Sequence, residues 1–234
     1  MLSAMVNLGT AQSVSLSVKA GLNMSSLQEI ALIQDGQAFG AASSLPSKPV
    51  TGFNAGIFAD MAFGHWSVQS GLVYTGIGGQ NNSAFVPATL ASGTNVTFYG
   101  YDTDKLNYLQ LPVDVLYHVP VNFGYVFMGL GPYLGYGLSG TKKILSYSIV
   151  NGTSTPTAER TYPDKFGSNA YAAEFKKFDW GTNALLGVEL KNKISLSIGY
   201  NYGLANVSNS NGENRYRNKT LQLSIGYAFS FKRN

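Results

Sequence analysis

Two histidines, His65 and His118, are the side chains best suited to acid–base or metal chemistry in this 234-residue chain. Neither has a second histidine at the spacing of a metal-binding pair, and no cysteine is present. Both lie beside short turns, where a lone histidine is more often a polar edge residue than a catalyst. The sequence therefore predicts no catalytic residue, no metal site and no cofactor.

Four charged residues form a second candidate group, because each lies on the polar side of a stretch in which apolar and polar residues alternate. They are Lys19, Asp60, Asp114 and Glu189. If these polar sides face a closed interior, isolated charges are costly and must be paired or hydrogen-bonded. We therefore predict a structural charge network in which Lys19 pairs with Asp114 or Asp60. The alternative is that water solvates each charge separately.

The elements that carry these residues are β-strands. VSLSVKAGLN places Val14, Leu16 and Val18 on one side and Ser15, Ser17 and Lys19 on the other, which is the period-2 pattern of a strand. Seven further stretches repeat the pattern, each about ten residues long, the length that a tilted strand needs to cross a bilayer. The eight stretches are residues 14–23, 51–63, 66–75, 108–118, 125–137, 179–190, 194–204 and 220–231.

The connections between these strands alternate strictly between short and long. Short turns are predicted around Gly64, residues 119–123 and residues 191–193, and long polar loops at residues 24–50, 78–104, 139–177 and 205–218. This alternation is typical of an up-and-down barrel whose strands are joined by short turns at one end and by long loops at the other. The stretches NVTFYGYD and TKKILSYSIV alternate weakly, which predicts that strands four to six continue beyond the membrane as a hairpin rim.

Composition decides which face of the strands is buried. Charged residues make up 12% of the chain, about half of the usual share in soluble domains, and no apolar run is long enough for a membrane helix. The apolar faces of the strands carry no charged residue. We therefore predict an all-β fold, an eight-stranded antiparallel up-and-down transmembrane β-barrel with a plugged lumen. A soluble ligand-binding barrel is the alternative.

Aromatic residues gather at both ends of the apolar faces, as in membrane barrels with aromatic girdles at the two interfaces. The predicted girdle at the long-loop end contains Tyr74, Tyr136, Trp180 and Tyr202, and the one at the short-turn end contains Trp66, Tyr117, Phe229 and Phe231. The alternative is that aromatic residues simply favour strands.

The first residues have the character of an export signal. Residues 1–11 offer a short apolar run followed by small residues, which suits cleavage before Gln12. We predict that residues 1–11 are the remnant of a signal peptide and that residues 12–234 form one barrel domain. The net charge of +4 is too small and dispersed to predict a nucleic-acid partner.

Five stretches resemble the PorT-like outer-membrane β-barrel family, which is common in Bacteroidota-type envelopes. They are VKAGLN, GFNAGIFAD, LNYLQLPVDVLYHVP, GLGPYLGYGLSG and IGYAFSF, and they occur in order along nearly the whole chain after Gln12. The resemblance implies the barrel fold and a place in the bacterial outer membrane. The namesake of the family is associated with type IX secretion, but no active-site motif comes with the resemblance.

The sequence thus predicts a non-catalytic integral outer-membrane protein with periplasmic termini and four long extracellular loops. Its expected partners are outer-membrane lipid and lipopolysaccharide, and other envelope or secretion-complex proteins. Two further alternatives stay open: a lipid- or peptide-modifying barrel enzyme, which needs a Ser/His/acid group at the outer rim, and a small pore.

Overall fold

Eight long strands form the body of the molecule in the computed structural model, which describes residues 13–30, 32–34, 37–39, 47–84, 88–89, 95–150, 153–167, 175–209 and 215–231. The eight strands are β1 (Ser13–Ile30), β4 (Val50–Phe63), β5 (Trp66–Ala84), β7 (Asn95–Val121), β8 (Gly124–Val150), β10 (Phe178–Leu190), β11 (Ile194–Gly203) and β12 (Arg215–Phe231). Four shorter strands complete the fold: β2 (Leu32–Gln34), β3 (Gln37–Phe39), β6 (Ala88–Thr89) and β9 (Thr153–Asp164).

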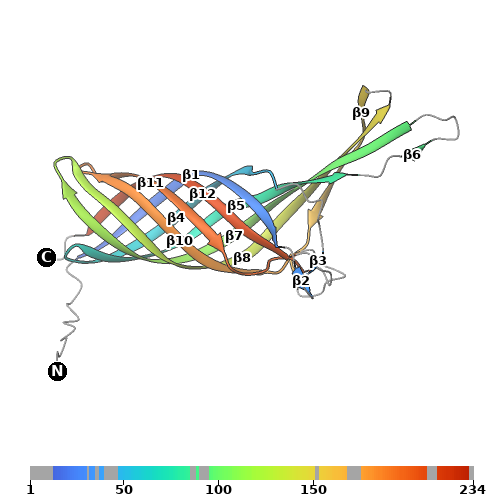
Figure 1. Cartoon of the computed structure of the whole chain (residues 1–234). Coiled ribbons are helices and arrows are strands. Elements are labelled where there is room, and N and C mark those ends of the chain that lie inside the picture. Colours follow the sequence, from blue (N-terminus) through green and yellow to red (C-terminus); the bar gives the residue numbers. More distant parts are fainter. Residues whose placement is uncertain are drawn as a thin grey trace.

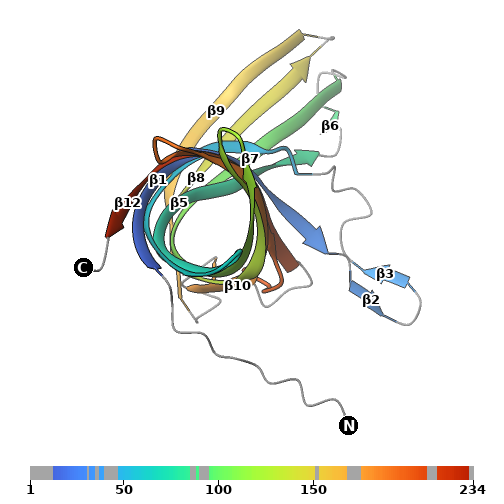
Figure 2. The same ribbon diagram turned by 90° about the vertical axis from the view of Figure 1, so that its left-hand side faces the viewer.

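The eight strands close into a ring, which Figure 2 shows in the view down its axis. The order around the ring is β1, β4, β5, β7, β8, β10, β11 and β12, and every pair is antiparallel. The first and last strands pair along their whole length, from Val14 opposite Phe231 to Ile30 opposite Arg215. The predicted eight-stranded antiparallel up-and-down barrel is therefore confirmed.

One end of the barrel, here called the turn end, carries the short connections. Residues 64–65, 122–123 and 191–193 join consecutive strands there, as the sequence predicted. Gly64 has a φ of 65° and Lys193 a φ of 70°, the left-handed conformation that reverses the chain within a tight turn. The first residue of β1, Ser13, and the last residue of β12, Phe231, also lie at this end (Figure 1).

At the opposite end the strands run far beyond the ring (Figure 1). We call the projecting sheet the paddle and define it as residues 95–106 of β7, residues 140–150 of β8, and β9. β9 pairs with β8 along its length, and a register shift at Asn107/Tyr108 marks the junction between barrel and paddle.

The paddle corrects the loop prediction for residues 78–104 and 139–177, much of which is strand. The predicted hairpin extension of the fourth and fifth strands is confirmed. The sixth barrel strand does not extend, because β10 begins at Phe178, and the separate strand β9 takes that place beside β8. Parts of the other two predicted loops also belong to strands, β1 to Ile30 and β12 from Arg215.

The two faces of the wall differ as their alternation predicts. Outward side chains form a continuous exposed apolar belt that includes Leu22, Leu130 and Leu223, with exposed fractions of 69%, 68% and 63%. Inward positions are buried and mostly polar, for example Asn23, Thr75 and Asp114. A water-facing surface does not present apolar area on this scale, so the structure disfavours the soluble alternative.

Residues 1–11, predicted as a signal remnant, lie outside the described residues. In the part of the chain that is described, no helix has the length and apolar character needed to span a membrane.

Candidate functional site

The barrel interior at mid-depth contains a polar relay around Lys19. The Lys19 ammonium donates to Oε1 of Gln69 at 2.6 Å, and Nε2 of Gln69 donates to Oδ2 of Asp60 at 2.8 Å. The ammonium also lies 4.5 Å from the centre of the Phe58 ring, within the range of a cation–π interaction. Lys19 therefore reaches Asp60 through an amide, where the sequence predicted a direct ion pair.

Gln69 fits this role because of the strand register. It lies directly opposite Asp60 in the β4–β5 ladder, while Lys19 lies opposite Gly56, four residues before Asp60 in β4. A side chain as long as glutamine spans that offset and offers both an acceptor and a donor. The sequence did not identify Gln69, although its inward position beside Asp60 was visible in the alternation of residues 66–75.

Asp114 lies beside the relay, directly opposite Gln69 in the β5–β7 ladder. Its side chain is buried, with 2% exposure, and it interacts with the amide of Asn183 on β10. Gly131 of β8 lies between the two, opposite Asn183. A Cβ at position 131 would lie 2.7 Å from Oδ1 of Asp114 and would overlap the Val113 carbonyl, so only glycine leaves room for the carboxylate.

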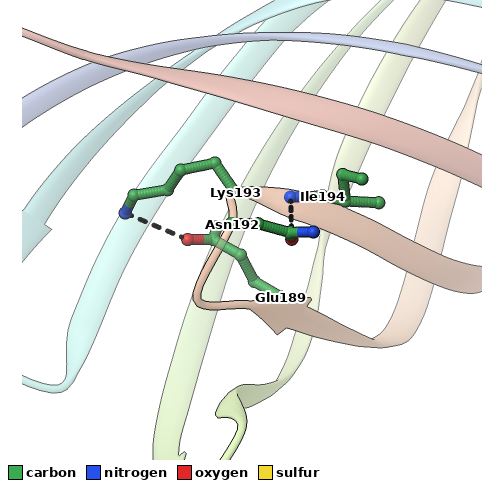
Figure 3. A network of polar contacts seen from close by, with 4 residues as sticks. All are labelled: Glu189, Asn192, Lys193 and Ile194. Carbon is green, nitrogen blue, oxygen red and sulfur yellow. Dashed lines mark hydrogen bonds and ion pairs between the residues drawn. The ribbon is translucent and has the colours of Figure 1, made fainter.

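Glu189 belongs to the turn end and not to the relay. The Lys193 ammonium lies 3.4 Å from Oε1 of Glu189 in an ion pair across the β10–β11 turn (Figure 3). In the same turn Oδ1 of Asn192 accepts a hydrogen bond from the Ile194 amide at 3.2 Å. Because both charged side chains are partly exposed, this pair contributes little to stability and mainly shapes the turn.

The two histidines also lie at the turn end. Nε2 of His118 is 2.9 Å from Oγ of Ser67, and Nδ1 of His65 is 3.2 Å from the His118 carbonyl oxygen. A serine beside an imidazole has the geometry of a nucleophile and its base. Ser67 is 2% exposed, however, and no acidic side chain among the described residues bonds the other nitrogen of His118. The pair acts as a polar cross-link between β5 and β7.

A ladder of amides and hydroxyls crosses the interior between the relay and the paddle end. Nδ2 of Asn54 donates to Oδ1 of Asn23 at 2.6 Å, and Nδ2 of Asn23 donates to Oγ1 of Thr75 at 2.8 Å. Oγ of Ser224 extends the ladder, donating to Oδ1 of Asn54 at 3.2 Å. Four strands are thereby joined inside the barrel by uncharged polar groups. The space left between relay and ladder is a cavity of about 60 Å³, lined by Lys19, Asp114, Asn183 and Gln222 among others.

An apolar cluster, here called the cap, fills the barrel mouth at the paddle end. It consists of Leu27, Ile77, Leu106, Tyr108, Phe175 and Val207, with Phe166 and Tyr216 packed against it. Phe166, Phe175 and Val207 come from connecting segments that fold back over the mouth, where Phe175 bridges both Phe166 and Ser208. Leu106, Tyr108 and Val207 are completely buried.

The cap was not predicted, since residues 165–177 and 205–209 read as polar loop. The one signal in the sequence was that Leu106 and Tyr108 place large apolar groups on the lumen side of a strand whose other lumen residues are mostly polar. The cap is thus a buried apolar layer across the paddle end of the lumen.

The paddle itself carries a group of three tyrosines. Tyr99 and Tyr147 stack at 5.0 Å between ring centres, and Tyr101 meets both rings edge-on. Their hydroxyl-rich surroundings include Ser154 of β9, whose Oγ is 2.6 Å from the Tyr99 hydroxyl oxygen. Below them, Lys143 and Glu159 form an ion pair at 2.7 Å. The tyrosines are partly exposed and lie well away from the barrel.

The aromatic residues predicted for the girdles lie on the outward face where their side chains are described. Trp66 is exposed at the turn end and contacts the Tyr117 ring in a tilted arrangement, and Phe229 is exposed beside Tyr227. At the paddle end Tyr136 and Trp180 are exposed, and Tyr74 and Tyr202 are partly exposed. The side chain of Phe231 lies outside the described part. Exposure alone does not fix depth in a membrane, so the girdles stay a prediction.

Among the described residues no group of three or more His, Cys, Asp or Glu side chains could hold a metal ion. Within the polar interior, the relay and the ladder link strands of the barrel wall through side-chain hydrogen bonds.

Comparison with protein families identifies the barrel. Residues 10–209 match the model of the family described as outer membrane protein beta-barrel domain. The chain belongs to this family. Membership supports a place in the bacterial outer membrane, and the apolar belt is then the surface that meets lipid. No curated protein matches the chain.

Two solved structures with which this family member aligns are small outer-membrane proteins. One is Ail of Yersinia pestis, solved with the heparin analogue sucrose octasulfate. The two sequences are 13% identical, the alignment covers 93% of this chain and 100% of Ail, and the TM-score is 0.36. The other is the neisserial surface protein NspA, with 12% identity, 93% and 100% coverage, and a TM-score of 0.37.

Proposed function

We propose that this chain is a non-catalytic outer-membrane protein whose closed barrel anchors the paddle on the outside of the cell, where it contacts other envelope proteins. The observation that carries the proposal is the contrast between the two ends. The relay, the ladder and the cap occupy the lumen, whereas the paddle extends beyond the ring (Figure 1) and the side chains of β9 are mostly exposed. A filled barrel suits an anchor and leaves the paddle as the part available for partners.

The orientation follows from the loop pattern. Outer-membrane barrels keep short turns and both termini on the periplasmic side, and in this chain the short turns lie at the same end as the start of β1 and the end of β12. We therefore place the turn end in the periplasm and the paddle outside. The resemblance to PorT-like proteins supports a partner within an envelope or secretion assembly.

Partner binding is expected to depend on the paddle tyrosines. Tyrosine is enriched at protein interfaces because its rigid ring buries a large area while its hydroxyl still hydrogen-bonds. We expect Tyr99→Ala/Tyr147→Ala to lose proteins that co-purify with the wild type from native envelopes in gentle detergent, as identified by mass spectrometry. Recovery of secretion or motility components with the wild type identifies the assembly.

The matched control is Thr155→Ala/Arg160→Ala, which changes two exposed side chains of β9 and spares the tyrosines. It should retain the partners. Equal recovery of the same proteins with both double variants would contradict a role for the tyrosines, and no specific partner with the wild type would contradict the assembly proposal.

The closed lumen predicts electrical silence. The cavity of about 60 Å³ between the relay and the ladder has room for only a few water molecules, so we expect no continuous aqueous path through the barrel. Planar-bilayer recordings of the purified protein should show no conductance across salts and voltages, with insertion verified by flotation of the same preparation in liposomes. Steady single-channel openings would establish the pore alternative instead.

A further inference from the structure

The outward face of β8, β10, β11 and β12 carries an aromatic group where the barrel meets the paddle end. Tyr136 lies opposite Phe178 in the β8–β10 ladder, with ring centres 5.4 Å apart. Trp180 and Tyr202 continue the group on β10 and β11. Phe178 and Trp180 are 58% and 52% exposed. The same face also exposes Leu134, Ile198 and Leu221, together with Tyr200.

Two lysines lie on this aromatic group. The Lys177 ammonium is 6.0 Å from the Tyr136 ring centre, and the Lys219 ammonium is 5.4 Å from the Tyr202 ring centre. Tyr202 and Lys219 are direct partners in the β11–β12 ladder, so both side chains point outward. Within the described residues neither lysine forms an ion pair. Their positive charges are therefore held at the rim by rings and not neutralised by carboxylates.

The acidic groups of this region are elsewhere. Asp104, Asp164 and Asp179 are buried, with at most 6% exposure. Glu159 faces outward but belongs to the paddle, where it pairs with Lys143. In the described part of the chain, the outward surface at this rim thus carries cations without nearby acids. A surface with this charge and an apolar face directly below it complements a molecule that has anionic groups above hydrocarbon.

We propose that the face formed by β8, β10, β11 and β12 binds a phosphorylated glycolipid of the outer leaflet, with Lys177 and Lys219 contacting its phosphate groups. The acyl chains lie along Leu134, Ile198 and Leu221, and the aromatic rings lie at the headgroup level. This inference rests on the orientation given under the proposed function, because only that orientation puts the lysines in the outer leaflet.

The test compares lipid A that carries its phosphates with dephosphorylated lipid A. Binding of each to the purified protein is measured in a zwitterionic detergent by fluorescence of a labelled lipid. A lysine near an anionic lipid surface contributes about 1 kcal/mol, so K177Q/K219Q is expected to bind the phosphorylated lipid roughly tenfold or more weakly. Its binding of the dephosphorylated lipid should equal that of the wild type.

The control variant K191Q/K193Q removes the same charge at the turn end and should bind like the wild type. Unchanged affinity of K177Q/K219Q for phosphorylated lipid A would overturn the proposal. So would full displacement of the lipid by millimolar inorganic phosphate, which would indicate an anion site without lipid recognition. Circular dichroism and heat-dependent gel mobility verify that both variants fold as barrels.

Orientation is tested separately, because the chain contains no cysteine. Thr157→Cys in β9 should react with a membrane-impermeant maleimide on intact cells, whereas Asn192→Cys in the β10–β11 turn should react only after lysis. The reverse pattern would refute the proposed function while leaving the lipid measurement valid. If the two cysteines are labelled as expected but the wild type binds both forms of lipid A equally, only the lipid site is refuted.

Discussion

Gly131→Ala is expected to destabilise the barrel by about 3 kcal/mol, the upper range for overpacking a filled interior. The added Cβ would overlap the carbonyl oxygen of Val113 and lie 2.7 Å from Oδ1 of Asp114. Both obstacles are held in place, the first by the strand ladder and the second by the Asn183 contact. The change is measured as the free energy of unfolding in detergent, followed by denaturant titration and by heat-dependent gel mobility.

Gly199→Ala is the matched control, because Gly199 is also a lumen-side glycine in a strand. A Cβ there meets its nearest neighbours at 3.7 Å, an ordinary contact distance. We expect the control to change the free energy of unfolding by less than about 1 kcal/mol. Similar losses in the two variants would show that the close packing of Asp114 against Gly131 does not determine the effect.

Lys19→Met is expected to lower the free energy of unfolding by about 2 kcal/mol. Methionine retains the length and apolar contacts of the side chain but removes the charge that faces Asp60 through Gln69. Removal of one partner from a poorly solvated polar pair leaves the other without compensation, which costs more than the pair contributes. Denaturant titration in detergent micelles measures this difference.

The double variant Lys19→Met/Asp60→Asn separates charge from packing. It removes the carboxylate that the single variant leaves uncompensated, so it should recover at least half of the lost stability. Lys191→Met, at the exposed β10–β11 turn, should be close to neutral. If the double variant is less stable than Lys19→Met, the relay is not the reason for the loss.

The barrel could be predicted from the sequence because its wall repeats one simple rule. Val14, Leu16 and Val18 face lipid for the same reason as Leu221, Leu223 and Ile225, and a period of two residues identifies a strand without knowledge of its neighbours. The short turns at Gly64 and residues 191–193 then fix the order of the strands. Where the alternation became weak, at residues 95–106 and 140–150, the strands were underestimated because many side chains of the paddle are partly buried whichever face they lie on.

The interior was less predictable, because it depends on side-chain contacts between strands that are distant in the sequence. Alternation identified Lys19, Asp60 and Asp114 as inward charges. The register decided that Gln69 stands between Lys19 and Asp60, and that Glu189 reaches Lys193 instead. The cap depends on Phe175 and Val207, which lie in irregular segments without any periodicity, and no pattern in the sequence assigns such residues to the inside of a barrel.

The pairing of β1 with β12 has a consequence for the order of assembly. Every other pair of neighbouring barrel strands is formed by strands that follow one another in the sequence, so the pairing can start at the connection between them. The β1–β12 pair instead joins Val14 to Phe231, across almost the full sequence. Contacts between such distant residues form slowly. Until they form, both terminal strands have unpaired backbone groups, which hydrocarbon does not tolerate. Ring closure is therefore the step that commits the chain to the membrane, and it is the step at which an insertion machinery that shields open strand edges would accelerate biogenesis most.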